Sequence, residues 1–201
     1  MCARLNSNIF GTFLPYFLVY TLQIGQSGST VPFSIALVPL VIYSSSTFIS
    51  TKLSLLYNQI GRKNSLILGT VLSLLSLGLL FLLDPSNNYL VYPLALLIGC
   101  SQSLLLATSI NLTSDVVGSK GDSGAVVFGV YSFLDKVSAG VLIYSIALLP
   151  CFSQVESLDK EERHPIRWIV IGIPMLSAAL AGLTVLIGGG VSEYGGGEKL
   201  S

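Results

Sequence analysis

Residues 124–149 read GAVVFGVYSFLDKVSAGVLIYSIALL and carry the strongest structural signal in the chain. Because a membrane-spanning helix needs ~20 mostly apolar residues, this stretch predicts a helix that crosses a bilayer. Asp135 and Lys136 nevertheless lie near its middle, where each charge costs roughly 2.5–3.5 kcal/mol on insertion scales. Adjacent residues lie about 100° apart around a helix, so these two side chains do not face each other. We therefore expect at least one of them to have a partner on another helix.

Two interpretations of this charged pair are open. Charged residues within membrane helices normally face a bundle interior or a water-filled cavity, where they mark a substrate or ion pathway. The alternative is a structural ion pair that holds two helices together.

The composition places the whole chain in a membrane. Its 201 residues are 52% hydrophobic and 10% charged, with a mean hydropathy of +0.77, whereas soluble domains are about 25% charged. Ten basic and ten acidic residues cancel, which indicates no nucleic-acid partner. The cysteines, at positions 2, 100 and 151, form no metal or redox motif. We find no paired carboxylates, nucleophile elbow or phosphate loop, so we expect neither an enzyme nor a bound cofactor or metal.

Apolar segments predict an all-α integral membrane protein with six transmembrane helices in one bundle. The expected spans are 8–24, 31–53, 65–83, 89–112, 124–149 and 167–187. The third span, rich in Leu, Ser and Gly, is expected to face lipid. Six spans put both termini and the loops 54–64 and 113–123 on one side. That side holds Arg4, Lys52, Arg62, Lys63, Lys120 and Lys199. Since cytoplasmic loops carry the Lys/Arg excess, we expect both termini in the cytoplasm.

Polar side chains inside the spans are further candidates for a site. Gln102 lies near the middle of the fourth span, and an amide in lipid needs a partner, either a cavity or another helix. Tyr16, Tyr20 and Gln23 follow at i, i+4 and i+7 and share a face near Asn8. This face predicts a cavity lining, and the alternative is an interfacial tyrosine belt.

The segment NQIGRK at 58–63 predicts a short loop between two spans. Gly61 permits a tight turn, and Arg62 and Lys63 can bond the carbonyl ends of a neighbouring helix. Together with Asn58 they form a candidate gating loop that latches one state of a transporter. A simple topology signal is the other interpretation, and both can hold at once.

The same segment is similar to the signature loop D-R-x-G-R-K of the major facilitator superfamily. Asn58 stands at the acidic position and Ser54 at the leading glycine, departures that fit the weaker second copy of that loop. The stretch 123–137 resembles the helix ten to helix eleven region of the branch containing major facilitator superfamily domain-containing protein twelve. Residues 36–45 and 108–115, and Arg4 with Asn8, resemble the same branch.

This resemblance implies the C-terminal half, helices seven to twelve, of a twelve-helix transporter, with the N-terminal half missing. The branch implies a lysosomal or melanosomal cysteine importer. A more distant similarity to the glycoside–pentoside–hexuronide cation symporters implies a sugar, and a lysine on their helix eleven matches Lys136.

We therefore expect a secondary active transporter, present as a half, that performs cation- or proton-coupled symport of a small solute such as cysteine or a sugar. Its expected partners are the lipid bilayer, the solute, the coupling cation or proton, and the missing half or a second copy. The expected substrate or coupling residues are Asp135, Lys136, Arg4, Asn8, Tyr16 and Gln102. The alternative is a truncated, non-transporting interaction subunit. The choice between a lysosomal or vacuolar membrane and the plasma membrane stays open.

Overall fold

The computed structural model describes residues 2–22, 33–83, 89–117, 124–149 and 164–188, and all regular structure in those ranges is helical. The helices are α1 (Cys2–Tyr16) with a π-helical turn η1 (Phe17–Thr21), α2 (Phe33–Ile60), α3 (Arg62–Phe81), α4 (Val91–Val117), α5 (Gly124–Ala147), and a last rod formed by α7 (His164–Arg167), the π-helical turn η6 (Trp168–Gly172) and α8 (Ile173–Gly188).

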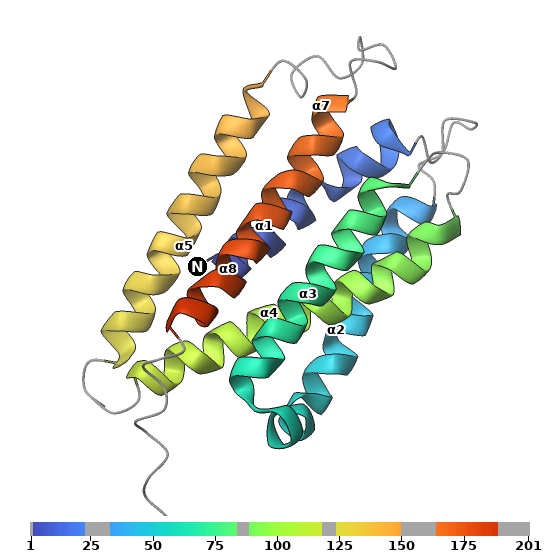
Figure 1. The fold of residues 1–201 in the computed structure, drawn as a ribbon. Helices are drawn as coiled ribbons and strands as arrows, with labels where there is room; N and C mark the ends of the chain where they lie inside the picture. Colours follow the sequence, from blue (N-terminus) through green and yellow to red (C-terminus); the bar gives the residue numbers. More distant parts are fainter. Residues whose placement is uncertain (1, 23–32, 84–88, 118–123, 150–163, 189–201) are drawn as a thin grey trace, which may run out of the picture.

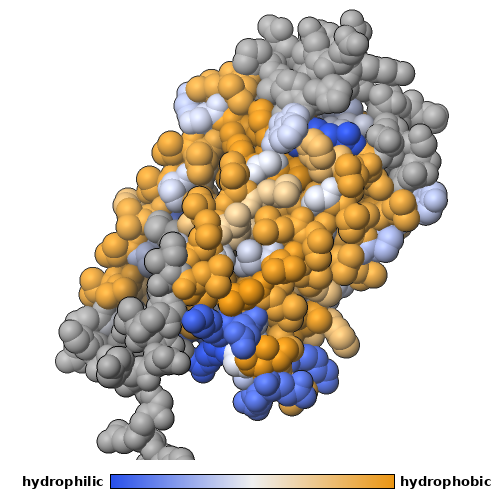
Figure 2. Space-filling model, viewed as in Figure 1, coloured by the Kyte–Doolittle hydropathy of each residue, from blue (hydrophilic) through white to orange (hydrophobic). Residues whose placement is uncertain are grey.

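Five of these helical segments are long and apolar enough to cross a membrane. They are Ile35–Ile60, Arg62–Phe81, Val91–Ser114, Gly124–Ala147 and Trp168–Leu186. Figure 2 shows the surface over α3 and α8 as broadly hydrophobic, with hydrophilic side chains gathered where α2 turns into α3. This distribution is typical of a bundle that exposes apolar side chains to lipid tails and polar ones to water. The chain is therefore an all-α, multi-pass membrane protein.

The helices form two groups that meet in the middle of the bundle (Figure 1). α4 packs against both α2 and α3, whereas α1 packs against α8. α3 also contacts α8, which joins the groups. α5 packs on α1 and, within the described ranges, touches other elements only marginally.

The core lies around α1 and η1, whose apolar side chains recur at three- and four-residue spacings. Its fully buried members include Ile9, Phe10, Phe13, Leu14, Phe17 and Leu18, packed against Val91, Ala95, Ile98, Ile166, Val170 and Ile171. These side chains come from α1, η1, α4, α7 and η6, so the first helix and the last helical rod share one core with α4.

Small residues set how closely the helices approach, as is common in membrane bundles. A Cβ on Gly99 of α4 would collide with the Ser45 hydroxyl of α2. A Cβ on Gly182 of α8 would lie 2.8 Å from the Thr70 methyl of α3, and one on Gly69 would press on α4. Each of these three crossings therefore depends on a glycine.

The prediction of a loop at 54–64 is wrong for most of these residues. α2 continues to Ile60 and α3 begins at Arg62, which leaves Gly61 alone at the turn with φ of 85°. Residues 54–60 contain no helix breaker, so the helix runs on until a residue that tolerates positive φ.

The prediction that the third span faces lipid is also wrong for one of its faces. Ser65, Gly69, Ser73 and Ser76 of α3 are buried, and α3 packs on α4 and α8. These small side chains follow at i, i+4, i+8 and i+11, a stripe that permits close helix contact. Exposed leucines cover the opposite face.

Candidate functional site

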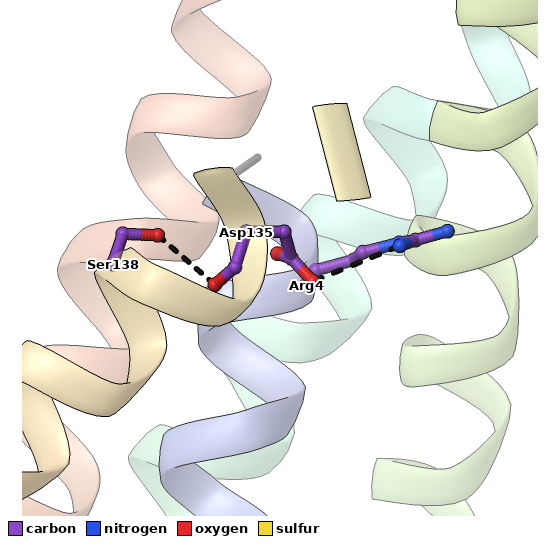
Figure 3. A network of polar contacts seen from close by, with 3 residues as sticks. All are labelled: Arg4, Asp135 and Ser138. Atoms are coloured by element: carbon purple, nitrogen blue, oxygen red, sulfur yellow. Dashed lines mark hydrogen bonds and ion pairs between the residues drawn. The ribbon is translucent and has the colours of Figure 1, made fainter. Parts of the chain in front are cut away.

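A buried ion pair joins α5 to α1. Arg4 Nη1 lies 3.7 Å from Asp135 Oδ2, and the Asp135 side chain is 1% exposed (Figure 3). Asp135 is the twelfth of the 24 residues of α5, so the pair lies half-way along that helix. The prediction that at least one of the two charges has a partner on another helix is confirmed for Asp135.

The position of Arg4 corrects one part of the topology argument. We counted Arg4 among the cations of an aqueous face, yet its partner lies half-way along α5. Figure 1 likewise shows the start of α1 part-way along the bundle rather than at its end. Arg4 therefore carries no information on which side the N-terminus lies.

The surroundings of the pair leave it incompletely bonded. The Arg4 guanidinium lies over the Tyr131 ring, 5.1 Å from its centre, which is within reach of a cation–π attraction. The Ser138 hydroxyl donates to the backbone carbonyl of Asp135, not to its carboxylate. Asp135 Oδ1 is buried and has no hydrogen-bond partner among the described residues. The 3.7 Å separation also exceeds that of a good hydrogen bond, so this carboxylate keeps capacity for a proton, a cation or a ligand donor.

Lys136 lies on a different face of α5. Its side chain is exposed, and it forms no ion pair with any side chain that the structure describes. The two adjacent charges thus have different environments, one inside the bundle and one on its surface.

A cleft of about 250 Å³ with a mixed polar and apolar lining opens between α1, α2 and α4. Its polar lining consists of Ser7, Asn8, Tyr43, Ser46 and Gln102, and its apolar lining includes Phe10, Leu14, Pro39, Ile42 and Leu106. Gly11 also lines the cleft, and a Cβ there would make ordinary contact with the Tyr43 hydroxyl at 3.7 Å. All five polar groups are uncharged donors and acceptors, which suits the hydroxyl or amide groups of a small polar solute.

Two predicted site residues meet in this cleft, although they lie far apart in the sequence. Asn8 comes from α1 and Gln102 from α4. Gln102 makes no hydrogen bond to another helix within the described ranges, so the bridging interpretation of this residue gains no support. Sequence reasoning missed Tyr43 and Ser46, although Ser46 belongs to a run of hydroxyl residues in the second span.

The ion pair and the cleft share one face of α1. Arg4, Ser7, Asn8 and Gly11 follow at i, i+3, i+4 and i+7, so the pair lies about one helical turn, or ~5.4 Å, from the cleft lining. Tyr16 lies elsewhere: it is 42% exposed and stacks on Tyr20 with ring centres 6.2 Å apart. The structure thus pairs Arg4 with Asp135, places Asn8 and Gln102 in one cleft a helical turn away along α1, and leaves Tyr16 apart. The predicted neighbour of that tyrosine face, at position 23, lies outside the described residues.

The candidate gating loop lies far from the cleft. Asn58, Gly61, Arg62 and Lys63 are exposed at the turn between α2 and α3. Ser46, the last cleft residue on α2, precedes Asn58 by 12 residues, about 18 Å along a helix. The loop can therefore influence the cleft only through the helices.

A polar latch that sequence reasoning missed lies directly before this turn. The Tyr57 hydroxyl lies 2.9 Å from Thr108 Oγ1 and accepts a hydrogen bond from Asn111 Nδ2 at 3.3 Å. It fixes the end of α2 to α4. Tyr57 is one tyrosine among nine in the chain, so only the tertiary contact distinguishes it.

Within the described ranges, no three His, Cys, Asp or Glu side chains form a group that could hold a metal ion. The arrangement provides one buried carboxylate, one guanidinium and a set of neutral hydrogen-bonding groups.

Comparison with known proteins identifies the family. The chain is 32% identical over 156 residues to major facilitator superfamily domain-containing protein 12 of Mus musculus, an alignment that covers 77% of this chain and 31% of that protein. The chain belongs to the major facilitator superfamily. The corresponding Homo sapiens protein is 33% identical over 156 residues, which cover 77% of this chain and 31% of that protein. The Equus caballus protein is 32% identical over 152 residues, which cover 75% of this chain and 30% of that protein.

The chain spans about a third of the length of the curated superfamily members that it matches. No family model and no solved structure matches it. The resemblance to the branch of domain-containing protein 12, stated above from 123–137 and the shorter stretches, is confirmed.

Proposed function

We propose that the chain is the C-terminal, six-helix half of a secondary active transporter, and that the Arg4–Asp135 pair with the adjoining cleft forms its wall of the transport site. The observation that carries the proposal is the buried, incompletely bonded carboxylate one helical turn from the cleft. A charge at mid-membrane depth is costly, and such charges mark transport pathways. Superfamily membership supports a transporter of small solutes.

The sixth span in this proposal is α1 with η1. Together they run from Cys2 to Thr21, which at 1.5 Å per residue is about 30 Å. They begin part-way along the bundle, because Arg4 pairs with the middle of α5. Their side chains form the centre of the buried core, so they cannot lie outside the bundle.

The exposed polar side chains support a missing partner. Lys136 lies half-way along α5 and is exposed, where contact with lipid would cost roughly 2.5–3.5 kcal/mol. α2 also exposes a run of polar groups near its middle, which are Ser44, Thr47, Ser50, Thr51 and Lys52. Lipid does not suit this surface. An N-terminal half, or a second copy of the chain, would cover it and close the transport site, because such sites form between the two repeats near the membrane midplane.

Coupling in this proposal runs through Asp135. When its carboxylate is charged, it attracts Arg4 and holds α5 against α1. A proton or cation that neutralises the carboxylate would release Arg4 toward Tyr131 and the cleft, where the guanidinium could bind an anionic group of the solute. Lys136 would pair with an acidic group of the partner half or with the solute. Asn8 and Gln102 would bind its neutral polar groups.

The solute in this proposal is cysteine or a sugar, and the two make different demands on the site. A zwitterionic amino acid would need Arg4 for its carboxylate, whichever ion neutralises Asp135. A sugar would need mainly the neutral groups of the cleft, such as Asn8 and Gln102. The effect of the Arg4→Gln variant on the two solutes therefore distinguishes them.

The test is uptake of radiolabelled cysteine and of a radiolabelled hexose into proteoliposomes that contain the full chain, with a proton gradient, a sodium gradient or neither. We expect gradient-dependent uptake that Asp135→Asn reduces at least about tenfold, equivalent to about 1.4 kcal/mol. Ser145→Ala is the matched control, because Ser145 is exposed on the same helix and bonds only the Val141 carbonyl.

The orientation and the membrane are part of the proposal. We propose that both termini face the cytoplasm, on the side of Arg62 and Lys63 at the α2–α3 turn. If the folded chain takes up neither solute under any gradient, either alone or reconstituted with the membrane protein to which it crosslinks, transport by this chain is refuted and a role as an interaction subunit replaces it.

A further inference from the structure

An apolar groove of about 480 Å³ runs along the outer surface between α3 and the last helical rod. It has no part in the cleft or the ion pair. Leu74, Gly78 and Leu82 line it on α3, and Trp168, Gly172 and Met175 line it on η6 and α8. Gly78 and Gly172 place no side chain in this space. A Cβ on Gly78 would meet nothing within 4 Å, so the groove is open beside it. Its volume lies within the range of ligand pockets, about 300–1,000 Å³.

The groove has one charged end. Arg167 lies over the Phe81 ring, 5.5 Å from its centre, and donates a hydrogen bond to the Leu83 carbonyl at the end of α3. Phe81 also packs edge-on against Trp168, with ring centres 4.7 Å apart. Phe81 and Trp168 line this end of the groove, and these contacts hold the Arg167 guanidinium beside it.

This end lies at a membrane boundary. Arg167 directly precedes the candidate span Trp168–Leu186, and the span of α3 ends at Phe81. Trp168 is 62% exposed, as is typical of the aromatic residues that lie at headgroup level. From Leu82 to Leu74 the groove runs eight residues along α3, about 12 Å, against about 15 Å for one leaflet of the hydrocarbon core.

We propose that this groove binds an anionic phospholipid, with one acyl chain between α3 and α8 and the headgroup phosphate on Arg167. The lining is apolar over the depth of one leaflet, which suits an acyl chain. The cation sits only at the boundary, where the phosphate of a lipid lies. A guanidinium presents five N–H donors in a planar fork that matches phosphate oxygens.

The test places the full chain in nanodiscs that contain equal amounts of phosphatidylglycerol and phosphatidylcholine. After transfer to detergent, native mass spectrometry counts the lipids that stay bound. We expect phosphatidylglycerol to be retained about tenfold over phosphatidylcholine, the factor that one charge-assisted hydrogen bond supplies. Arg167→Gln should abolish this preference.

A groove-filling variant tests the site independently of Arg167. Gly172→Leu places a side chain in the groove, and a Cβ there would meet only Trp168, at 3.8 Å. We expect it to reduce the bound phosphatidylglycerol at least about fivefold, which corresponds to about 1 kcal/mol. Gly129→Leu is the control, because Gly129 is equally open but lies on α5.

Three results would overturn the proposal. One is equal retention of the two lipids by the unaltered chain. Another is a Gly172→Leu chain that binds phosphatidylglycerol as the unaltered chain does. The third is a dimer without bound lipid whose formation Gly172→Leu blocks, since a helix of a second copy would then occupy the groove. If Arg167→Gln fails to fold, the Gly172→Leu result decides.

Discussion

Replacing Asp135 by leucine should destabilise the bundle by about 2–3 kcal/mol. Breaking a buried ion pair by removing one partner typically costs 3–5 kcal/mol, because the other charge stays behind uncompensated. Here Arg4 is 27% exposed and keeps its contact with the Tyr131 ring, which is worth about 0.5–2 kcal/mol, so the cost falls below that range. Arg4→Leu should cost more, about 3–5 kcal/mol, because Asp135 is only 1% exposed and its charge would remain fully buried.

The double variant is the decisive comparison. Removing both charges takes away the desolvation cost together with the attraction, so Arg4→Leu/Asp135→Leu should have nearly the stability of the unaltered chain. The coupling free energy between the two positions should therefore be about 5–8 kcal/mol, the sum of the two single effects, well above the ~0.5 kcal/mol deviation that independent sites show. Unfolding of the reconstituted chain in an SDS titration, followed by circular dichroism, measures all four free energies.

Hydrogen exchange locates the effect. α5 packs on α1, and its other described contacts are marginal, so loss of the pair should first raise amide exchange along 124–147. Lys136→Leu is the matched control, because it removes the adjacent charge on an exposed face. The reasoning fails if the Arg4 and Asp135 effects simply add in the double variant, or if Lys136→Leu loosens α5 as much as Asp135→Leu does.

Three further stability measurements test the packing. Gly99→Ala should lower the free energy of unfolding by about 1–3 kcal/mol, since its Cβ would collide with Ser45. Gly78→Ala, in open space, should leave this free energy unchanged or raise it by up to about 1 kcal/mol. Equal effects of the two variants in the SDS titration would contradict this. Tyr57→Phe should cost about 1 kcal/mol by removing two interhelical hydrogen bonds of about 0.6 kcal/mol each, and an unchanged thermal midpoint would refute the latch. Gly61→Ala should cost about 1–3 kcal/mol through its positive φ alone, because nothing lies within 4 Å of the added Cβ, and a neutral result would show that the turn adapts.

Hydropathy predicted that these helices exist but not where they end. It reports which residues are stable in lipid, whereas a helix ends where the backbone must change direction. The helix through Tyr57 and Ile60 therefore continues past the predicted span to Gly61, a glycine that adopts positive φ at no steric cost. The inward face of α3 was missed for a related reason: Ser73 and Ser76 are nearly neutral in a hydropathy sum, although their small size lets α4 and α8 approach.

The need for an ion pair was predictable, but its partner was not. The cost of a mid-span charge required a neighbour for Asp135 or Lys136 from the sequence alone. Several cations could have supplied it, and only the packing of α1 against α5 selects Arg4. Similarly, Asn8 and Gln102 were each recognisable as polar residues in lipid, while their meeting in one cleft depends on the crossing of α1 and α4.

The geometry of the Arg4–Asp135 pair favours a contact that forms and breaks over a permanent lock. Two helices that must never separate would be expected to share close, fully satisfied hydrogen bonds, whereas this pair is 3.7 Å apart and leaves Asp135 Oδ1 without a described partner. It also joins the bundle to α5, whose contacts within the described ranges are mainly with a single neighbour, α1. If the pair were purely structural, the double leucine variant would fold stably and transport as before. We expect it instead to fold stably and lose gradient-driven uptake, because in the proposed mechanism the coupling ion acts on the Asp135 carboxylate. Stability from the SDS titration and uptake in proteoliposomes, measured on the same preparation, separate these two roles.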